Sequence, residues 1–313
     1  MNKKISLIGS GQIGGTIAQI MATKSMGEIV LVDIAVGMPQ GKALDISQMI
    51  AISKSNARIS GHNDYTNINN SDVIIVTAGI PRKPGMSRSD LVEINSSIIS
   101  EISKEIKHRA PNAFVIIITN PLDAMTWTAL KITKFQSNKI VGMAGVLDSA
   151  RFASFLSAEL NVDISSIKAM VLGGHGDSML PLPKYTTISG IPIASFIKNN
   201  FITQEKLDNI IQRTRNAGAE IVNLLKTGSA FYAPAAAAIV MAEAYLYDKK
   251  QIVPATTYLK GEYGRNNLCI GVPVIIGAKG VEKIIELELT AKEKDMFNKS
   301  ADDVEELINT IKI

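Results

Sequence analysis

Gly9-Ser10-Gly11-Gln12-Ile13-Gly14 fits the pattern G-x-G-x-x-G, and its surroundings indicate a function for it. The hexapeptide directly follows a short apolar run, residues 5–8, and opens a stretch of helix-forming residues, 12–21. A glycine turn without a ligand has the same six letters, but a strand before them and a helix after them are typical of a dinucleotide-binding unit. The glycines there let the backbone turn tightly, approach a pyrophosphate and pack against the helix, whose first N–H groups bind the phosphates. We therefore expect residues 9–14 to bind a dinucleotide.

Asp33 stands where such a unit needs a carboxylate for the ribose. That residue is expected about 20 positions beyond the glycines, at the end of the second strand. Asp33 directly follows a second apolar run, residues 29–32. A carboxylate at this point accepts hydrogen bonds from the ribose hydroxyls and repels a 2′-phosphate, which favours NAD over NADP. A solvated turn residue is the alternative for Asp33.

The first half of the chain alternates between apolar runs and stretches with helical spacing. This alternation indicates a parallel sheet covered on both faces, so residues 1–145 are predicted to form a doubly wound α/β domain. Residues 146–313 lack the alternation and are predicted to form a second, mixed α+β domain. The expected strands are residues 5–8, 29–32, 57–60, 73–76, 114–118, 140–141, 167–172, 252–259 and 268–276. The expected helices are residues 12–21, 41–50, 90–107, 122–132, 148–160, 207–225, 234–247 and 291–311.

The composition is that of a globular protein. Of the 313 residues 46% are hydrophobic and 20% are charged, which excludes disordered and fibrous classes. The net charge is +4 and the basic residues are scattered, whereas a nucleic-acid-binding protein would show a dense basic stripe. The best apolar run, residues 233–242, is far shorter than the roughly 20 residues that cross a membrane. We expect neither nucleic acid nor membrane as a partner.

The single cysteine, Cys269, excludes an intrachain disulfide and is consistent with a reducing compartment. The apolar stretch after the N-terminal MNKK is too short for an export signal, so a cytoplasmic location is expected. The cysteine and the histidines show no metal-ligand spacing, and no metal is expected.

Three histidines are available for proton transfer near neutral pH: His62, His108 and His175. His175 follows the expected strand 167–172 within Gly-Gly-His-Gly-Asp, and the flanking glycines allow its ring to face a cleft. His62, in a Gly-His-Asn-Asp segment, and His108, at a helix end, are predicted to be solvated. A polar loop residue remains the alternative for His175.

Further polar residues are expected near the carboxyl ends of the strands, where ligands bind in doubly wound sheets. Asp148 and Arg151 share one helix face, either as site residues or as an ordinary surface ion pair. Asn120 ends the expected strand 114–118. Arg82 and Arg88 lie in a loop rich in proline and glycine after strand 73–76, which suits either a cationic lid or a solvated basic loop.

Five motifs, in their order along the chain, resemble those of the lactate/malate dehydrogenase superfamily. They match best the NAD-dependent malate dehydrogenases that are similar to lactate dehydrogenases. The motifs are GSGQIGG at 9–15, AGIPRKPGMSR at 78–88, TNPLD at 119–123, LDSARF at 147–152 and GGHGD at 173–177. The resemblance covers essentially the whole chain and implies a Rossmann NAD-binding domain followed by a catalytic domain, with NAD as cofactor.

The resemblance also implies a role for each matching residue. His175 would exchange a proton with the C2 hydroxyl of malate, and Asp148 would hold its imidazole and favour the protonated form. Arg151 would clamp the C1 carboxylate, Arg88 would polarise the ketone, and Asn120 would bind the substrate oxygen. An imidazole titrates near pH 6.5, which suits reversible proton transfer. The residues implied on the nicotinamide side are Asn95, Ile118, Thr119 and Asn120.

Arg82 is the position at which this family separates malate from lactate. Lactate dehydrogenases typically carry glutamine there, whereas an arginine would meet the second carboxylate of oxaloacetate. Pyruvate would leave that charge unpaired, so we expect a preference on the order of 10² for the dicarboxylate. The lid lacks the insertion that gives some parasite lactate dehydrogenases another specificity residue. Ser229 aligns less securely with the pocket wall.

Several alternatives stay open. A lactate dehydrogenase or another 2-hydroxy acid dehydrogenase would share most of these residues. A catalytically silent NAD-binding module would lack the histidine, aspartate and arginine, and an NAD-dependent glycosidase would hold a metal through cysteine and histidine. The resemblance implies a homo-oligomer, a tetramer or a dimer, in which helices 41–50 and 207–225 either contact other subunits or pack within their own.

Overall fold

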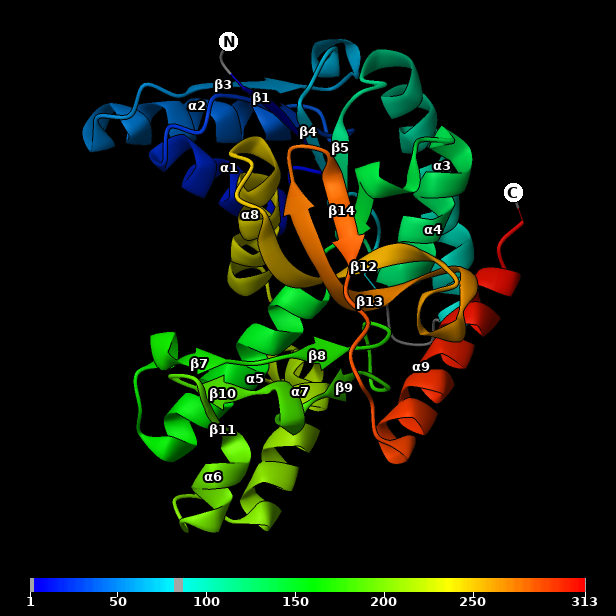
Figure 1. The fold of residues 1–313 in the computed structure, drawn as a ribbon. Helices are drawn as coiled ribbons and strands as arrows, with labels where there is room; N and C mark the ends of the chain where they lie inside the picture. Colours follow the sequence, from blue (N-terminus) through cyan, green and yellow to red (C-terminus); the bar gives the residue numbers. More distant parts are fainter. Residues whose placement is uncertain (1–2, 82–86, 313) are drawn as a thin grey trace.

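A computed structural model describes residues 3–81 and 87–312 of the chain, except for the side chain of Arg88. The largest sheet in this part has the strand order β14-β13-β12-β6-β5-β4-β1-β2-β3. Figure 1 shows it on one side of the molecule, with a smaller group of helices and short strands on the other. Its strands are β1 (Lys4–Ile8), β2 (Glu28–Val32), β3 (Arg58–His62), β4 (Val73–Val76), β5 (Phe114–Ile117), β6 (Ile140–Gly142), β12 (Gln251–Lys260), β13 (Asn266–Gly277) and β14 (Gly280–Ile284).

The strands from β1 to β6 are parallel, as the apolar runs predicted. Ile5 of β1 pairs with Ile29 of β2 on one side and with Val73 of β4 on the other. All side chains of β4 and β5 are buried, which is the burial expected of strands covered on both faces. In the order β6-β5-β4-β1-β2-β3, successive strands are added on one side of β1 as far as β3 and on its other side from β4 onward. Such a topological switch point, here between β1 and β4, opens a crevice at the carboxyl ends of the strands. The predicted doubly wound Rossmann fold is confirmed.

Helices cover both faces of this sheet (Figure 1). On one side α1 packs against α2 and α8, and on the other α4 packs against α3 and α9. α9 runs along the edge of the molecule and also contacts the smaller group of helices and short strands. These helices are α1 (Gln12–Thr23), α2 (Met38–Ser53), α3 (Arg88–Arg109), α4 (Leu122–Thr133), α8 (Tyr232–Leu246) and α9 (Ala291–Asn309).

The β pair predicted for the second half does not form a sheet of its own. β12 and β13 pair with each other as expected, but Thr256 of β12 also pairs with Gly142 of β6. The pair therefore extends the parallel sheet in the antiparallel sense, across the boundary predicted near residue 145. The reason is that β12 and β13 are buried along most of their length, and α4 (Leu122–Thr133) of the first half packs against both of them.

The expected strand 167–172 divides in two. Ile167 packs in a small core beneath the main sheet, whereas Leu172 belongs to the main core, so the apolar run connects two cores. β7 (Ile167–Lys168) pairs with β10, and β8 (Val171–Leu172) pairs with β9. The other elements are β9 (Leu180–Pro181), β10 (Thr187–Ile188), β11 (Ile191–Pro192), α5 (Gly145–Leu160), α6 (Ile193–Lys198) and α7 (Gln204–Leu225). Short 3₁₀ helices lie at Thr66–Ile68, Ser137–Lys139, Ile164–Ser166, Pro183–Tyr185 and Glu262–Gly264.

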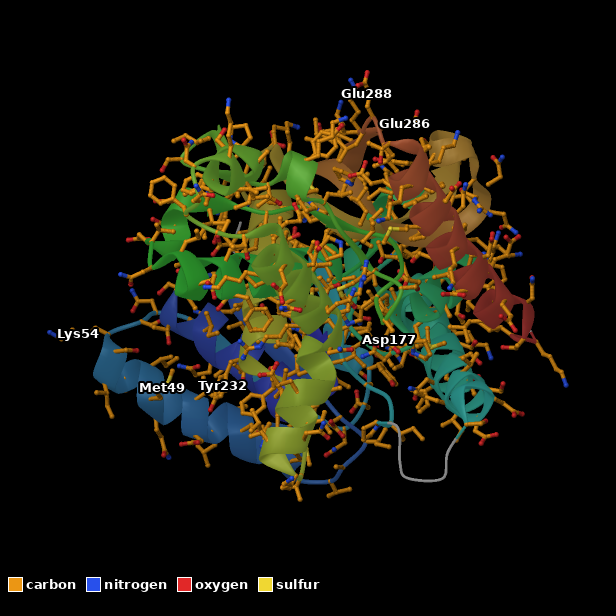
Figure 2. All side chains as sticks on the ribbon, turned by 90° about the horizontal axis from the view of Figure 1, so that it is seen from below. Met49, Lys54, Asp177, Tyr232, Glu286 and Glu288 are labelled. Atoms are coloured by element: carbon orange, nitrogen blue, oxygen red, sulfur yellow. The ribbon has the colours of Figure 1, made fainter. Side chains whose placement is uncertain are left out.

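In the view of Figure 2, side chains with nitrogen and oxygen atoms extend from the ribbon around the outline of the molecule. Lys54, just after α2, and Glu286 and Glu288, before α9, lie at widely separated parts of it. Along the described residues, no helix has both the length and the apolar character needed to cross a membrane.

Candidate active site

The loop between β1 and α1 has the shape that a pyrophosphate requires. Gly9 has a φ of +105°, and a Cβ added to Gly14 would lie 1.9 Å from the carbonyl oxygen of Gly9. A Cβ added to Gly11 would meet no atom within 4 Å, so the space beside it is open. Gly11 is the N-cap of α1 and no side chain caps this helix, which leaves its first N–H groups available to an anion. The glycine loop therefore fits the phosphates of NAD.

Asp33 lies just after β2 and contacts this loop. Its Oδ2 accepts a hydrogen bond from the Ser10 N–H at 2.6 Å, and its Oδ1 accepts one from the Ala35 N–H at 2.9 Å. Each oxygen keeps a further lone pair for a ribose hydroxyl. Ser10 also has a buried hydroxyl without a hydrogen-bond partner among the described residues. Asp33 thus links the ribose position to the glycine loop.

Lys42 of α2 also holds the glycine loop, and sequence reasoning missed it. Its Nζ donates to the carbonyl oxygen of Gly11 at 2.8 Å. Burial lowers the pKa of Lys42, and the charge of Asp33 opposes this shift. A lysine 31 residues beyond its acceptor gives no recognisable signal in one sequence.

The residues predicted for the nicotinamide side are mostly buried behind the loops. Asn95 is fully buried, and its amide group bonds the backbone of Ile80 and the carbonyl oxygen of Asn120. Ile118 and Thr119 are buried as well, and the Thr119 hydroxyl donates to a carbonyl oxygen at 2.6 Å. Of these four residues only Asn120 is exposed. The side chains of Asn95 and Thr119 therefore hold neighbouring loop backbone in place by hydrogen bonds, behind the crevice.

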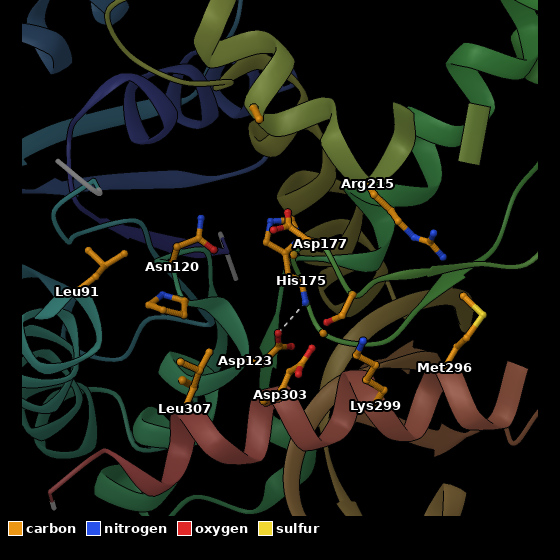
Figure 3. A pocket seen from close by; sticks show the side chains of 17 residues that line it. Leu91, Asn120, Asp123, His175, Asp177, Arg215, Met296, Lys299, Asp303 and Leu307 are labelled. Carbon is orange, nitrogen blue, oxygen red and sulfur yellow. Dashed lines mark hydrogen bonds between the residues drawn. The ribbon is translucent and has the colours of Figure 1, made fainter. Parts of the chain in front are cut away.

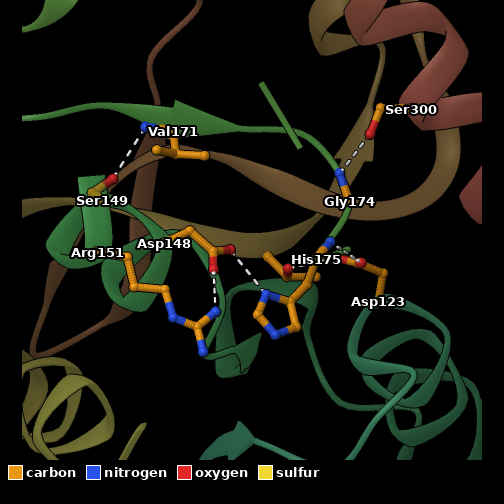
Figure 4. A network of polar contacts seen from close by, with 9 residues as sticks. Asp123, Asp148, Ser149, Arg151, Val171, Gly174, His175 and Ser300 are labelled. Atoms are coloured by element: carbon orange, nitrogen blue, oxygen red, sulfur yellow. Dashed lines mark hydrogen bonds and ion pairs between the residues drawn. The ribbon is translucent and has the colours of Figure 1, made fainter. Parts of the chain in front are cut away.

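His175, Asp148 and Arg151 form one hydrogen-bonded cluster (Figure 4). Asp148 and Arg151 project from α5, and the glycine-flanked loop after β8 brings His175 to them. The imidazole Nδ1 lies 2.8 Å from Asp148 Oδ2, and Arg151 Nη1 donates to Asp148 Oδ1 at 3.2 Å. The side chains are 16%, 3% and 13% exposed for the histidine, aspartate and arginine respectively. A carboxylate at Nδ1 leaves Nε2 for a substrate.

The surroundings of His175 favour its charged form. Burial by itself lowers the pKa of this imidazole, but the charge and hydrogen bond of Asp148 and the charge of Asp123 outweigh the burial. Arg151 acts in the opposite direction. The net effect is a pKa above the usual value of a histidine, so an imidazolium is available at neutral pH.

Asp123 contacts this cluster, although sequence reasoning gave it no role. Its Oδ2 accepts the backbone N–H of His175 at 2.7 Å, and its Oδ1 accepts the hydroxyl of Thr256 at 2.7 Å. The motif TNPLD contains this aspartate, but the two partners lie 52 and 133 residues away in sequence. Only the fold shows what the aspartate contacts.

A cavity of about 810 Å³ opens beside His175 (Figure 3). Asn120 borders it after β5, Asp177 borders it from the histidine loop, and Arg215 and Lys299 border it from α7 and α9. Arg215 Nε donates to a carbonyl oxygen of the histidine loop at 3.0 Å. The cavity therefore joins the crevice of the parallel sheet to the second half of the chain.

Some predicted substrate residues cannot be compared with the structure. Arg82 lies outside the described residues, and Arg88 begins α3 but its side chain is outside them too.

Ser229 is exposed and is not one of the described residues that line the cavity. Arg151 does not line it either, since it approaches Asp148 from within α5.

The other two histidines and the cysteine are not members of this hydrogen-bonded cluster. His62 ends β3 rather than lying in a loop, is half-buried and bonds Asn67, whereas His108 is exposed. Cys269 is buried in β13, and burial raises the pKa of its thiol. Within residues 3–81 and 87–312, no group of three or more His, Cys, Asp or Glu is arranged to hold a metal ion.

Comparison with known proteins identifies the family over nearly the whole chain. Residues 3–142 match the NAD-binding domain of lactate/malate dehydrogenases, and residues 145–312 match their α/β C-terminal domain. The chain thus has an NAD-binding domain, as the glycine loop and Asp33 predicted.

Solved structures of both kinds of dehydrogenase are similar to this chain. Malate dehydrogenase from Cryptosporidium parvum is 49% identical, with a TM-score of 0.97 over 99% of this chain and 98% of that one. Lactate dehydrogenase from the same organism, solved with lactic acid and nicotinamide adenine dinucleotide, is 46% identical, with a TM-score of 0.96 over 99% and 98%. Malate dehydrogenase from Plasmodium falciparum is 39% identical, with a TM-score of 0.95 over 98% of each chain. Identity alone does not separate the two activities.

Proposed function

The chain belongs to the lactate/malate dehydrogenase family, and we propose that it acts as a malate dehydrogenase rather than as a lactate dehydrogenase. It is an oxidoreductase with NAD as cofactor, and the proposed reaction is the reversible conversion of malate and NAD⁺ to oxaloacetate and NADH. Bound nicotinamide supplies the hydride chemistry, and the protein supplies binding, orientation and proton transfer.

The observation that supports a dehydrogenase mechanism is the His175–Asp148 pair beside the cavity. In malate oxidation neutral His175 accepts the proton of the C2 hydroxyl at Nε2, and in oxaloacetate reduction the imidazolium returns it. Asp148 holds the proton at Nδ1, so the ring keeps the tautomer that this exchange needs. This role requires a histidine whose pKa lies near the working pH, which the two nearby carboxylates favour.

The substrate carboxylates are proposed to meet arginines. Asp148 accepts a hydrogen bond from Arg151, and the guanidinium lies beside Gly218 of α7. A Cβ added to Gly218 would lie 3.8 Å from Arg151 Nη2, so the helix does not crowd the guanidinium. The guanidinium can then make two parallel hydrogen bonds to the C1 carboxylate. We propose for Arg88, Arg82 and Asn120 the roles that the family resemblance implies, in which Arg82 would bind the second carboxylate.

Arg82 supports malate over lactate, because an arginine left without a carboxylate partner in a closed site costs several kcal/mol. Replacing Arg82→Gln removes this cost for pyruvate and the partner for oxaloacetate. We expect the ratio of kcat/KM for oxaloacetate to that for pyruvate to fall by about tenfold or more. The control is Arg58→Gln, an exposed arginine at the start of β3. An unchanged ratio in Arg82→Gln would assign substrate choice to other residues.

We also propose a homo-oligomer in the cytoplasm. Exposed apolar side chains on α2 and at the end of α7 support subunit contacts, and they include Leu44, Ile52, Val222, Leu224 and Leu225. Light scattering of the purified protein would test this, since a monomeric mass contradicts it. Fractionation of the source cells would test the location.

A further inference from the structure

Three successive amides of the loop that carries His175 are held by three different elements. The Gly173 N–H donates to a carbonyl oxygen of β13 at 2.9 Å, and the Gly174 N–H donates to the Ser300 hydroxyl of α9 at 2.9 Å. The His175 N–H donates to Asp123 Oδ2 of α4 at 2.7 Å. Only the third acceptor is a charged side chain, and it binds the histidine itself.

Two hydrogen-bond donors and a helix N-terminus favour the ionised form of the Asp123 carboxyl, and burial opposes it. The residue is 5% exposed, and each of its oxygens accepts a hydrogen bond, one from Thr256 and one from His175. The His175 N–H can only donate, so Oδ2 is the oxygen of Asp123 that stays unprotonated. Asp123 also lies in the first turn of α4, where the helix dipole favours a negative charge. Burial, with a smaller contribution from the charge of Asp148, raises the pKa of this carboxyl above its usual value, and its two hydrogen bonds and the charge of His175 reduce the rise.

We propose that Asp123 is a positioning residue for His175, which fixes the backbone of the histidine by its hydrogen bond and stabilises the imidazolium by its charge. Figure 4 shows His175 between Asp148 and Asp123. Asp148 bonds the ring and Asp123 bonds the main chain, so two buried carboxylates act on one imidazole by separate routes. The proposal rests on the proposed function, in which this imidazole exchanges the substrate proton.

Other charged groups also lie near His175, and their charges add to the effect of Asp123 on the imidazole. Arg151 opposes protonation, because it places a positive charge near the ring. Among the described residues, the charged groups around His175 are Asp148 and Arg151 on α5, Asp123 on α4, Asp177 on its own loop, Arg215 on α7, and Lys299 and Asp303 on α9. Asp148 bonds the ring of His175 and Asp123 bonds its main-chain N–H, whereas Arg151 bonds Asp148.

The test separates the charge of Asp123 from its hydrogen bonds. In Asp123→Asn the amide oxygen can accept the His175 N–H, and the amide N–H₂ can donate to Thr256, so the contacts persist and the charge is lost. The chain has three histidines, so NMR titration of the imidazole C–H signals can follow each one, with His175→Gln identifying the signal of interest. We expect the pKa of His175 to fall by roughly 0.5–1 in Asp123→Asn.

Ser300→Ala is the matched control, because it removes the neighbouring amide anchor without removing a charge. We expect the pKa of His175 to be unchanged in this variant. Thr256→Val is a second variant in case Asp123→Asn does not fold. It takes one donor from the carboxylate, which raises the pKa of Asp123 and reduces its charged fraction, so the pKa of His175 should fall by a smaller amount. An unchanged pKa in the Asp123 and Thr256 variants, or an equal fall in Ser300→Ala, would overturn the role of the charge.

A kinetic measurement provides the second readout. The alkaline limb of kcat/KM for reduction of the 2-oxo acid should move to lower pH in Asp123→Asn by the same amount as the NMR titration. The NMR titration needs no substrate, so it still decides the role of Asp123 if the protein reduces neither oxaloacetate nor pyruvate. In that event the proposed function fails separately.

Discussion

The loop after β1 and the loop after β8 both contain glycines, but they are built in opposite ways. In the first, glycines remove side chains so that backbone N–H groups reach an open space, as at Gly11. In the second, the glycines let the backbone pass close to α9, where a Cβ on Gly174 would lie 2.6 Å from Val304, and bring His175 to two buried carboxylates. The cofactor loop offers open space and the backbone N–H groups of a helix N-terminus, whereas the histidine loop places its side chain next to buried carboxylates.

This difference predicts what each region tolerates. A cofactor loop of this kind is sensitive to added volume and little affected by a single charge elsewhere. A histidine loop enclosed by carboxylates depends on protonation, because a charge in a buried site is costly unless its partners remain. The following predictions test the contrast.

The largest effect is expected from His175→Gln. The variant keeps a polar side chain but cannot exchange a proton, so kcat should fall by about 10²–10⁴. NADH affinity, measured by fluorescence titration, should stay within about twofold, because the cofactor loop is separate. His108→Gln, at an exposed histidine, is the control. Residual activity near the native rate would assign proton transfer to another group.

Two alanine substitutions in the cofactor loop should act in different ways. In Gly14→Ala the Cβ meets the Gly9 carbonyl oxygen, and overpacking of this kind costs about 1–3 kcal/mol of stability. In Gly11→Ala the Cβ enters open space, so stability should hold within about 0.5 kcal/mol. NADH binding should nevertheless weaken by about tenfold, because the Cβ occupies the side where the pyrophosphate approaches. Thermal unfolding and NADH titration of both variants measure this, and equal losses of stability would contradict it.

A smaller effect is expected from Arg151→Lys. Lysine keeps the charge but loses the two-pronged geometry, and a hydrogen bond to a charged group is worth about 1.5–3 kcal/mol. We expect kcat/KM for oxaloacetate to fall roughly ten- to a hundredfold. Arg213→Lys, which alters an exposed pair with Glu220, is the control. A native value in Arg151→Lys would show that the carboxylate binds elsewhere.

The smallest effect concerns pH. Because the pKa of His175 is raised above 6.5, oxaloacetate reduction should persist above pH 6.5 and decline as the pH rises through the raised value. Malate oxidation should increase over the same range. The stability that the pair contributes should be complete below about pH 6.5 and lost above the raised pKa. Rate profiles in both directions and unfolding at several pH values measure this; a limb below pH 6.5 would contradict the raised pKa.

The cofactor region could be predicted because its signals are contiguous. β1, the glycines and α1 follow one another directly, and Asp33 follows the next apolar run. The His175 cluster could be predicted only from the combined resemblance of several motifs to one family, because its members are distant in sequence. The bond from Gly174 to Ser300 spans 126 residues and that from Asp123 to Thr256 spans 133, so no local pattern indicates either.

The pairing of β12 with β6 escaped prediction for a similar reason. An apolar antiparallel pair shows that two strands meet, but it does not show which sheet edge they cover. Asn95 shows a further limit, because the family resemblance implied its place on the nicotinamide side but did not indicate the two loops whose backbone its amide bonds. Residue types were predictable at these positions, and the partners were set by the tertiary fold.

A competition between two substrates tests the central claim most directly. The native protein receives equal concentrations of oxaloacetate and pyruvate with limiting NADH, and the malate and lactate formed are quantified together. Their ratio equals the ratio of the two kcat/KM values, and we predict an excess of malate on the order of 10². Comparable amounts, or an excess of lactate, would contradict the assignment as a malate dehydrogenase.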